Sequence, residues 1–204
     1  ASGSENRYVI DGVDTTDAFD GTSGQNLITE FVEEVQVKSA GYPAEFGGSV
    51  GGVINAVTKS GTNEFKGWVG VYYNDRDWDG AERATPYDTG TTLYRTFEDD
   101  ITRIEPGFGI GGPIAQDMAW FYGGYTYTEI ETNRTPPGQT TKTQNDKLEY
   151  YLLNIKGNVG SSFLYKVSGN WAPRNLDNTL PARDGSTPES VNLNVDTEIP
   201  TYSY

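Results

Sequence analysis

The sequence contains no cysteine and no histidine, and these two absences remove several kinds of chemistry. Without cysteine there is no disulfide, no thiolate nucleophile and no cysteine metal site. Without histidine a Ser-His-Asp arrangement cannot be built, and the commonest zinc ligand is missing. A chain without cysteine is compatible with several compartments, so this absence excludes chemistry rather than a location.

Basic residues are scarce. The 204 residues include 15 Lys and Arg against 29 Asp and Glu, which gives a formal net charge of −14. Binding to nucleic acid depends on clustered Lys and Arg that neutralise phosphates. The charge therefore argues against nucleic acid as a partner.

Long apolar runs are also missing. No stretch approaches the roughly 20 apolar residues that a membrane-spanning helix needs. The sequence is instead rich in glycine (25 residues) and in aromatic residues, with 14 Tyr, 8 Phe and 4 Trp. This composition suits strands with one polar face rather than a helical core, and a membrane β-barrel hides its apolar residues in such alternation.

From residue 65 onward, apolar and polar residues alternate with a period of two, which predicts β-strands. Each run is about 8–11 residues long, near the length of a tilted membrane-spanning strand. The connections alternate between long polar segments (75–102, 131–146 and from 172 on) and short turns (around 113–118 and at 160–161). Long and short connections in alternation are typical of an outer-membrane barrel. The five predicted strands are 65–74, 103–110, 120–128, 151–159 and 163–171.

The first 63 residues have a different pattern. A short strand, 7–10, ends at the turn dipeptide Asp11-Gly12. A short helix is expected from Leu27, with Thr29 as its N-cap, followed by strands at 35–38 and 53–58. The glycine-dense stretch 41–52 lacks the Gly-Lys-Ser/Thr ending of a phosphate loop, so we interpret it as a tight structural turn.

Two groups of aspartates are candidate cation sites. Asp75, Asp77 and Asp79 begin like a calcium loop, but position twelve of that loop is Pro86 rather than Glu, so only a looser calcium site is predicted. Asp11, Asp14, Asp17 and Asp20 recur at every third position. This second pattern predicts either a cation-binding loop or, preferably, a solvated loop with Asx turns.

The tryptophans and paired acids offer two further hypotheses. Trp120 and Trp171 lie at strand ends, which suits the aromatic girdle of a barrel, whereas Trp78 lies in a loop and is the candidate ligand contact. The acids Glu98, Asp99 and Asp100, or Glu129 with Glu131, resemble carboxylate pairs of glycosidases. Acids are abundant here, so we expect no enzyme, no catalytic residue and no cofactor apart from calcium.

Four segments of the first 65 residues form a distinctive series: RYVIDGVD (7–14), EFVEEV (30–35), GYPAEFG (41–47) and GGSVGGVINAVTKSGTNEF (47–65). They resemble the end of the plug domain in TonB-dependent outer-membrane receptors, and more closely the Oar-like branch of that family. A later segment, GGPI at 111–114 followed by WFY at 120–122, is similar to the first short periplasmic turn of these receptors.

The resemblance implies a mainly β fold, with the C-terminal part of a plug domain in residues 1–63 and the first antiparallel strands of a transmembrane β-barrel in residues 64–204. We expect the chain to be a processed or partial piece of a longer polypeptide, since five strands leave open edges in lipid. The implied function is ligand capture at external loops and plug, then transport across the outer membrane of a Gram-negative bacterium. The implied partners are outer-membrane lipid, an unknown ligand, and the TonB complex through a segment outside this chain.

Two alternatives remain open at this stage. The same β scaffold could serve adhesion or assembly at the cell surface without transport. A soluble carbohydrate-binding β-sandwich would also show alternating strands and polar loops, although its strands are usually shorter.

Overall fold

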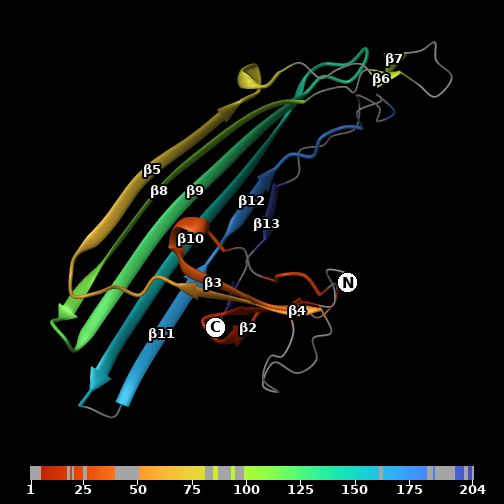
Figure 1. Ribbon diagram of the computed structural model, residues 1–204. Helices are drawn as coiled ribbons and strands as arrows, with labels where there is room; N and C mark the ends of the chain where they lie inside the picture. Colours follow the sequence, from red (N-terminus) through yellow and green to blue (C-terminus); the bar gives the residue numbers. More distant parts are fainter. Residues whose placement is uncertain are drawn as a thin grey trace.

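The described residues form two main β-sheets, a small one from the first 58 residues and a large curved one from the rest, and a two-stranded sheet at residues 85–86 and 93–94 (Figure 1). The computed structural model describes residues 6–17, 19, 21–24, 27–39, 51–80, 85–86, 93–94, 99–160, 163–182, 186, 196–199 and 202–203. No helix in these ranges is long and apolar enough to span a membrane.

The small sheet has four strands in the order β2-β1-β4-β3. Strand β1 pairs antiparallel with β2 across the predicted turn, where Asp11 (φ 51°) and Gly12 (φ 85°) both adopt left-handed backbone. Strand β1 also pairs in parallel with β4, and β4 pairs antiparallel with β3. The strand bounds are β1 Asn6–Ile10, β2 Val13–Asp14, β3 Val32–Lys38 and β4 Gly52–Thr58.

The predicted helix at Leu27 is wrong. Only one 3-10 turn forms, η2 at Thr29–Phe31, and its N-cap residue is Ile28 with no side-chain cap. The chain enters β3 directly afterwards, because the alternating residues 32–38 gain more by pairing with β4 than three residues gain as a helix.

The large sheet forms a continuous antiparallel wall. Its central order is β5-β8-β9-β10, after which β11 and β12 both pair with β10. The bounds are β5 Lys66–Asp75, β8 Asp100–Ala115, β9 Ala119–Arg134, β10 Lys142–Val159, β11 Phe163–Trp171 and β12 Arg174–Asp177; the minor elements are η4 Arg76–Trp78, β6 Thr85–Pro86, β7 Leu93–Tyr94, β13 Asp196–Ile199 and β14 Tyr202–Ser203. The mainly β fold with an antiparallel wall is therefore confirmed.

Three of the five predicted strands are longer than expected. Strands β8 and β9 have 16 residues each and β10 has 18, whereas β5 and β11, with 10 and 9, keep the predicted length. At about 3.3 Å per residue, 16 residues cover about 53 Å, well beyond a hydrocarbon core of about 25–30 Å. The predicted loop 131–146 is thus mostly strand, because residues 131–134 pair with residues 142–145.

The physical reason for this difference lies in the composition of the extension. From residue 131 on, β9 and the part of β10 that pairs with it carry polar side chains on both faces, so the period-two signal fades while the backbone ladder continues. The segment after Trp171 was also expected to be a loop. Strand β12 instead continues along β10, with Arg174 opposite Leu148.

The outward face of the wall is apolar and exposed. Val69 is 85% exposed, and Val71, Phe108, Leu153 and Val167 are exposed as well. An aromatic row crosses four neighbouring strands of this face, with ring centroids 4.8–6.0 Å apart: Phe108, Tyr125, Tyr151 and Trp171. A soluble sandwich buries its apolar face, whereas this face is suited to lipid with aromatics near the interface.

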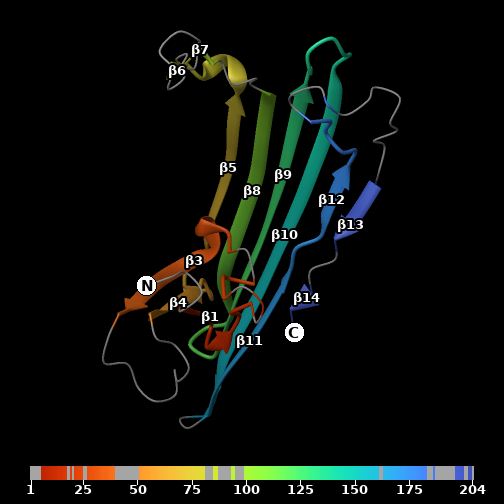
Figure 2. The same cartoon turned by 90° about the vertical axis from the view of Figure 1, so that its right-hand side faces the viewer.

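The small sheet lies on the opposite, concave face of the wall (Figure 2). The contact centres on Phe31, which is fully buried at the end of η2. Its ring packs against Trp68, Tyr122 and Tyr150, with centroids 6.0, 6.2 and 5.6 Å away. These three residues come from β5, β9 and β10, so one side chain joins the small sheet to three strands of the wall.

Glycine makes this approach feasible. Gly124 lies under Phe31, and a Cβ added there would come within 2.2 Å of the Phe31 ring. The ring cannot swing aside, because three aromatic side chains surround it. The absence of a side chain at Gly124 therefore leaves room on the concave face for the Phe31 ring.

Replacement of Gly124 by alanine should weaken the contact between the two sheets. Overpacking of this kind costs about 1–3 kcal/mol. Gly169→Ala is the matched control, since nothing lies within 4 Å of a Cβ at that strand position. Urea titration of the intact protein should show a lower midpoint for Gly124→Ala than for Gly169→Ala, and equal midpoints would contradict the packing argument.

A charge on the outward face should oppose insertion into lipid. Val69→Arg should cost about 2–4 kcal/mol near the bilayer midplane and less near its edges. Thr132→Arg, on the concave face, should have little effect. The measurement is the fraction of intact protein that shows heat-modifiable gel mobility after refolding into lipid vesicles; similar fractions for both variants would show that Val69 does not face lipid.

Candidate functional site

The contact between the small sheet and the wall, called here the seam, holds the principal polar groups of the concave face. Trp68 of β5 stands in its middle and donates from its indole nitrogen to the Tyr122 hydroxyl over 3.1 Å. Trp68 borders two cavities, an outer one beside η2 and an inner one beside the chain that leaves β4.

The outer cavity has a volume of about 410 Å³. The η2 turn closes one side, and strands β5, β8 and β9 form the other. Within it Arg103 forms an ion pair with Glu105, and the Thr128 hydroxyl donates to the same carboxylate over 3.1 Å. The principal polar and aromatic lining residues are Glu30, Tyr72, Arg103, Glu105, Thr126 and Thr128.

This lining suits binding rather than bond-making chemistry. It offers hydroxyls, carboxylates, one guanidinium that Glu105 already neutralises, and aromatic surface. Such a mixture of apolar surface with a few placed polar groups is the usual composition of a ligand pocket.

The inner cavity, of about 360 Å³, lies where the chain passes from β4 to β5. Gly61 has φ +73°, and a Cβ there would lie 2.2 Å from the Phe121 carbonyl oxygen, so the chain threads tightly along β9. Asn63 then fixes the linker to the β8–β9 turn: its side-chain oxygen accepts from the Asp117 N–H (3.0 Å) and from the Trp120 indole (2.6 Å). Trp120 therefore holds this linker.

A compact polar cluster at the seam surrounds Asp11. The Asp11 carboxylate accepts from the Thr58 N–H (3.0 Å), the Thr58 hydroxyl and the Lys166 ammonium (2.5 Å). Asn154, fully buried on β10, donates to the Thr58 hydroxyl (2.6 Å) and to the Lys59 carbonyl (2.7 Å). Burial alone would raise the pKa of Asp11, but Lys166 and Thr58 outweigh it and hold the pKa below its usual value.

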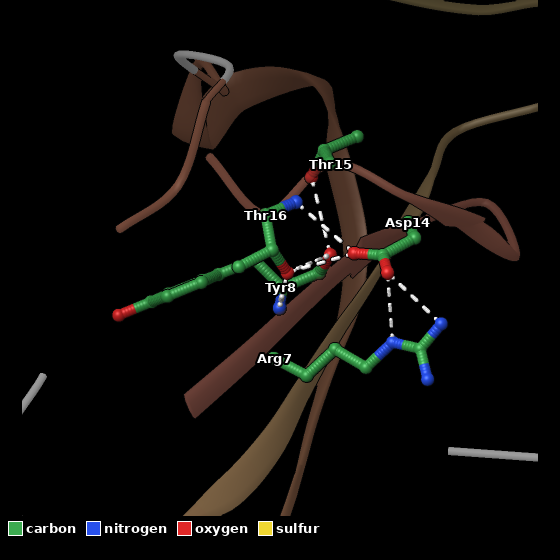
Figure 3. Close-up of polar contacts among 5 residues, drawn as sticks. All are labelled: Arg7, Tyr8, Asp14, Thr15 and Thr16. Carbon is green, nitrogen blue, oxygen red and sulfur yellow. Dashed lines mark hydrogen bonds and ion pairs between the residues drawn. The ribbon is translucent and has the colours of Figure 1, made fainter. Parts of the chain in front are cut away.

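The β1–β2 hairpin has its own polar lock (Figure 3). The Arg7 guanidinium contacts the Asp14 carboxylate over 2.9 Å, and the Thr16 hydroxyl donates to the same carboxylate over 2.7 Å. The Tyr8 N–H donates to the Thr16 hydroxyl over 2.9 Å. These contacts fasten the chain after β2 back onto β1.

This hairpin and the chain after it contain the aspartates that recur at every third position, for which a cation-binding loop or Asx turns were predicted. Asp14 accepts from the Thr16 N–H and Asp17 from the Phe19 N–H, which are Asx turns of the preferred interpretation. Asp11 instead belongs to the seam. Asp20 lies outside the described residues.

At the far end of the wall, a buried ion pair gathers three outer segments. Arg134, the last residue of β9, donates to both oxygens of Asp99 over 2.7 Å. A third nitrogen of Arg134 donates to the Pro181 carbonyl over 2.7 Å. Asp99 therefore serves as the partner of a bidentate arginine rather than as half of the glycosidase-like pair considered above, and Glu98 lies outside the described residues.

The predicted calcium residues lie at the outer end of β5. Asp75 accepts from the Tyr73 hydroxyl (2.6 Å) and the Asp77 N–H (3.0 Å), while Asp79 lies 3.8 Å from Arg76. In the part of the chain that the structure describes, no group of three or more acidic side chains is arranged to hold a metal ion. Calcium binding by Asp75, Asp77 and Asp79 stays a prediction.

Trp78, the predicted ligand contact, is 68% exposed in η4. Its ring meets that of Tyr73 edge-on, with centroids 5.1 Å apart. Tyr73 belongs to the outward face, so Trp78 stands on the outer rim beside that face. Its contact with a ligand stays a prediction.

Sequence reasoning missed the residues that build the seam. It also missed the ion pair of Arg134 with Asp99, called here the outer clasp. Phe31 was part of a predicted helix, and Lys166, Asn154 and Arg134 appeared only as polar positions of strands or loops. The available signal was the alternation itself, which put Lys166 and Asn154 on the polar face of their strands. The alternation could not show that Lys166 contacts Asp11, because the two residues are 155 positions apart in the sequence.

Comparison with known proteins places this geometry in a family. Residues 57–174 match the family described as an outer membrane beta barrel domain. The chain is 36% identical over 152 residues to the TonB-dependent transporter Oar of Myxococcus xanthus. That match covers 70% of this chain and 14% of Oar, so the chain spans only a small part of the length of this relative.

Solved structures share the fold. The outer membrane transporter YddB from Escherichia coli is similar with a TM-score of 0.69 at 18% identity, over 87% of this chain and 26% of YddB. The siderophore receptor PirA from Acinetobacter baumannii is similar with a TM-score of 0.55 at 18% identity, over 90% of this chain and 26% of PirA.

These relatives are named as transporters and receptors, in agreement with the expectation that the chain is not an enzyme. The family match covers strands β5 to β11 of the wall. The chain thus belongs to the outer membrane beta barrel family of the Gram-negative outer membrane.

Proposed function

We propose that this chain is the gating part of a TonB-dependent transporter, in which a ligand is captured at the outer loops and the seam and then moves across the outer membrane. In this proposal residues 1–63 are the C-terminal part of the plug, and residues 64–204 are the first strands and loops of the barrel. The ligand and the direction of its movement are left open.

The observation that carries the proposal is the seating of the small sheet on the concave face. Phe31 fits over Gly124 among three aromatic rings, so the small sheet fills space that the barrel wall would otherwise leave open. A wall with lipid-suited residues outside and polar cavities inside is a membrane barrier with a passage. A separate sheet seated in that passage can act as its gate.

The outer cavity supports a role in ligand capture. It lies next to η2, so a ligand bound there would contact the proposed plug at Glu30 and the barrel at Arg103 and Thr126 together. A ligand that touches both parts can favour one arrangement of the seam over another, because it binds the two arrangements with different affinity.

The proposed partners divide by location. Lipid contacts the outward face, the ligand meets the concave face, and the TonB complex pulls through a segment outside this chain. Adhesion or assembly without transport remains the alternative, and the dependence of the activity on TonB separates the two.

Filling the outer cavity should abolish transport without unfolding the wall. Thr126→Trp adds bulk among Trp68, Gly107 and Thr128, whereas Val71→Trp adds the same bulk to the outward face. Each variant is introduced into the intact receptor in the native host. Mass spectrometry of periplasmic and external fractions then identifies compounds or proteins whose distribution depends on the receptor.

The expected result is that Thr126→Trp and loss of TonB change the same set of molecules, whereas Val71→Trp leaves that set unchanged. If the distribution depends on the receptor but not on TonB, the transport proposal fails and a surface role is favoured. If Val71→Trp acts as strongly as Thr126→Trp, the outer cavity is not the capture site.

Loss of the outer clasp should loosen the outer segments and leave the seam intact. Arg134→Ala leaves the buried Asp99 carboxylate without its bidentate partner, and breaking such a pair costs about 3–5 kcal/mol. Arg134→Lys should restore only part of the order, since an ammonium does not reproduce the fork.

Limited proteolysis of the intact receptor in outer membranes measures this effect. Cleavage between residues 99 and 102 and near residue 181 should accelerate in Arg134→Ala and accelerate less in Arg134→Lys. Arg174→Met, which removes a more exposed pair with Asp146, is the control. Equal cleavage rates in Arg134→Ala and Arg174→Met would show that the clasp does not order these segments.

A further inference from the structure

The Asp11 carboxylate is the meeting point of four chain segments. It belongs to the β1–β2 turn, and its donors come from the end of β4 and from β11. Strand β10 joins through Asn154, which donates to Thr58. Two segments are thus from the small sheet and two are from the wall.

The cluster is enclosed except on the side of Lys166, whose side chain is 29% exposed. The Asp11 side chain is 8% exposed, Thr58 is 1% exposed and Asn154 is fully buried, while Lys166 reaches in from β11. A buried carboxylate is costly without compensating donors. Displacement of the small sheet from β11 by about the length of one hydrogen bond removes Lys166 from this carboxylate, whereas Thr58 moves together with Asp11.

The turn itself is a suitable place for such a contact. Asp11 adopts φ 51°, a left-handed conformation that aspartate tolerates better than most residues. Its N–H donates to the Ala56 carbonyl over 2.9 Å, which holds the turn against β4. The carboxylate therefore projects from a fixed backbone position toward the wall.

We propose that Asp11 and Lys166 form a latch that keeps the small sheet seated on β11, beside the Asn154 contact with β10, and that opening of this latch is a required step in unseating the small sheet. Its use as a gate rests on the proposed function; its existence as a latch does not. Phe31 supplies the apolar contact of the seam, and the latch supplies the contact that depends on charge.

The groups around Asp11 indicate when the latch is closed. Lys166 faces it from β11, and Thr58 and Ser168 present hydroxyls. Tyr150 on β10 is a further titratable group, on which the charge of Asp11 acts. The pKa of Asp11 lies below its ordinary value of 3.8, so the stabilisation is present above that value and is lost as pH falls through the lower folded-state pKa. The latch is therefore closed at neutral pH, and mechanical displacement rather than pH opens it.

A double-mutant cycle in the intact receptor tests the latch. The variants are Asp11→Asn, Lys166→Met and the combination of both, with Lys166→Arg as the conservative replacement. The readout is hydrogen exchange of the Lys59 amide, which donates to the Phe31 carbonyl at the point where Asn154 of β10 holds the Lys59 carbonyl. Exchange is measured in detergent at neutral pH without ligand or TonB.

Lys166→Met should raise the exchange rate of the Lys59 amide at least tenfold, and Lys166→Arg should restore most of the protection. In the Asp11→Asn background, Lys166→Met should change the rate by less than threefold, because its partner is already neutral. A matched control cycle uses Arg174→Met and Asp146→Asn, an ion pair within the wall that should leave the Lys59 amide unchanged.

Additive effects of the two substitutions, or an unchanged rate in Lys166→Met, would overturn the latch. Global unfolding is recognised because amides of the β8–β9 ladder would then exchange as well. The experiment requires no transport, so a working latch in a receptor that does not depend on TonB would refute the proposed function alone. Transport by a receptor whose Lys166→Met variant exchanges normally would refute the latch alone.

Discussion

The packing of Phe31 against the wall is the interaction on which the arrangement of the two sheets depends. Its ring touches aromatic side chains from three strands and lies over Gly124, where a side chain would collide with it. Burial of one phenylalanine contributes about 1.5–3 kcal/mol, a large fraction of what a small contact between sheets can supply. The positions of the two cavities follow from it, because both border Trp68 beside this ring.

Polar contacts fix the position of the small sheet along the strands of the wall. Asp11 fixes one end of the small sheet to β11, Thr58 fixes it to Asn154 of β10, and Asn63 fixes the linker to the β8–β9 turn. Hydrogen bonds to a charged group are shorter and stronger than neutral ones, and they are lost steeply when geometry changes. The apolar packing of Phe31 together with a few charged hydrogen bonds can therefore hold the small sheet on the wall. The sheet is released when these hydrogen bonds break.

One antiparallel sheet has an apolar outward face and a polar concave face. Its outward face exposes Val69 and an aromatic row, whereas its concave face carries the Arg103–Glu105 pair and the Asp11 cluster. Beyond the aromatic row, polar strands continue and are gathered by Arg134 and Asp99. This extension places an ordered surface outside the hydrophobic band, next to the entrance of the outer cavity.

The sequence alone determined which residues form strands in the membrane-suited part of the wall, because alternation is a local property set by two opposite solvents. Strand β5 and strand β11 were predicted nearly to the residue for this reason. The resemblance in the first 65 residues also indicated an outer-membrane barrel protein, because its motifs are local in sequence. The lengths of β8, β9 and β10 were not accessible, since polar strands outside the bilayer pair through their backbones and leave no pattern in the side chains.

Only the tertiary structure decided the seam. Phe31 was expected in a helix, Asp11 in an acidic loop and Lys166 on a polar strand face. None of these local predictions names the contacting residue, because Tyr122 and Lys166 lie more than 90 positions from Phe31 and Asp11. The long-range contacts Asn154–Thr58 and Lys166–Asp11 span 96 and 155 positions. Contacts of such sequence separation arise from how the two sheets stack, which depends on the fit of Phe31 over a glycine and not on the residues adjacent in the chain.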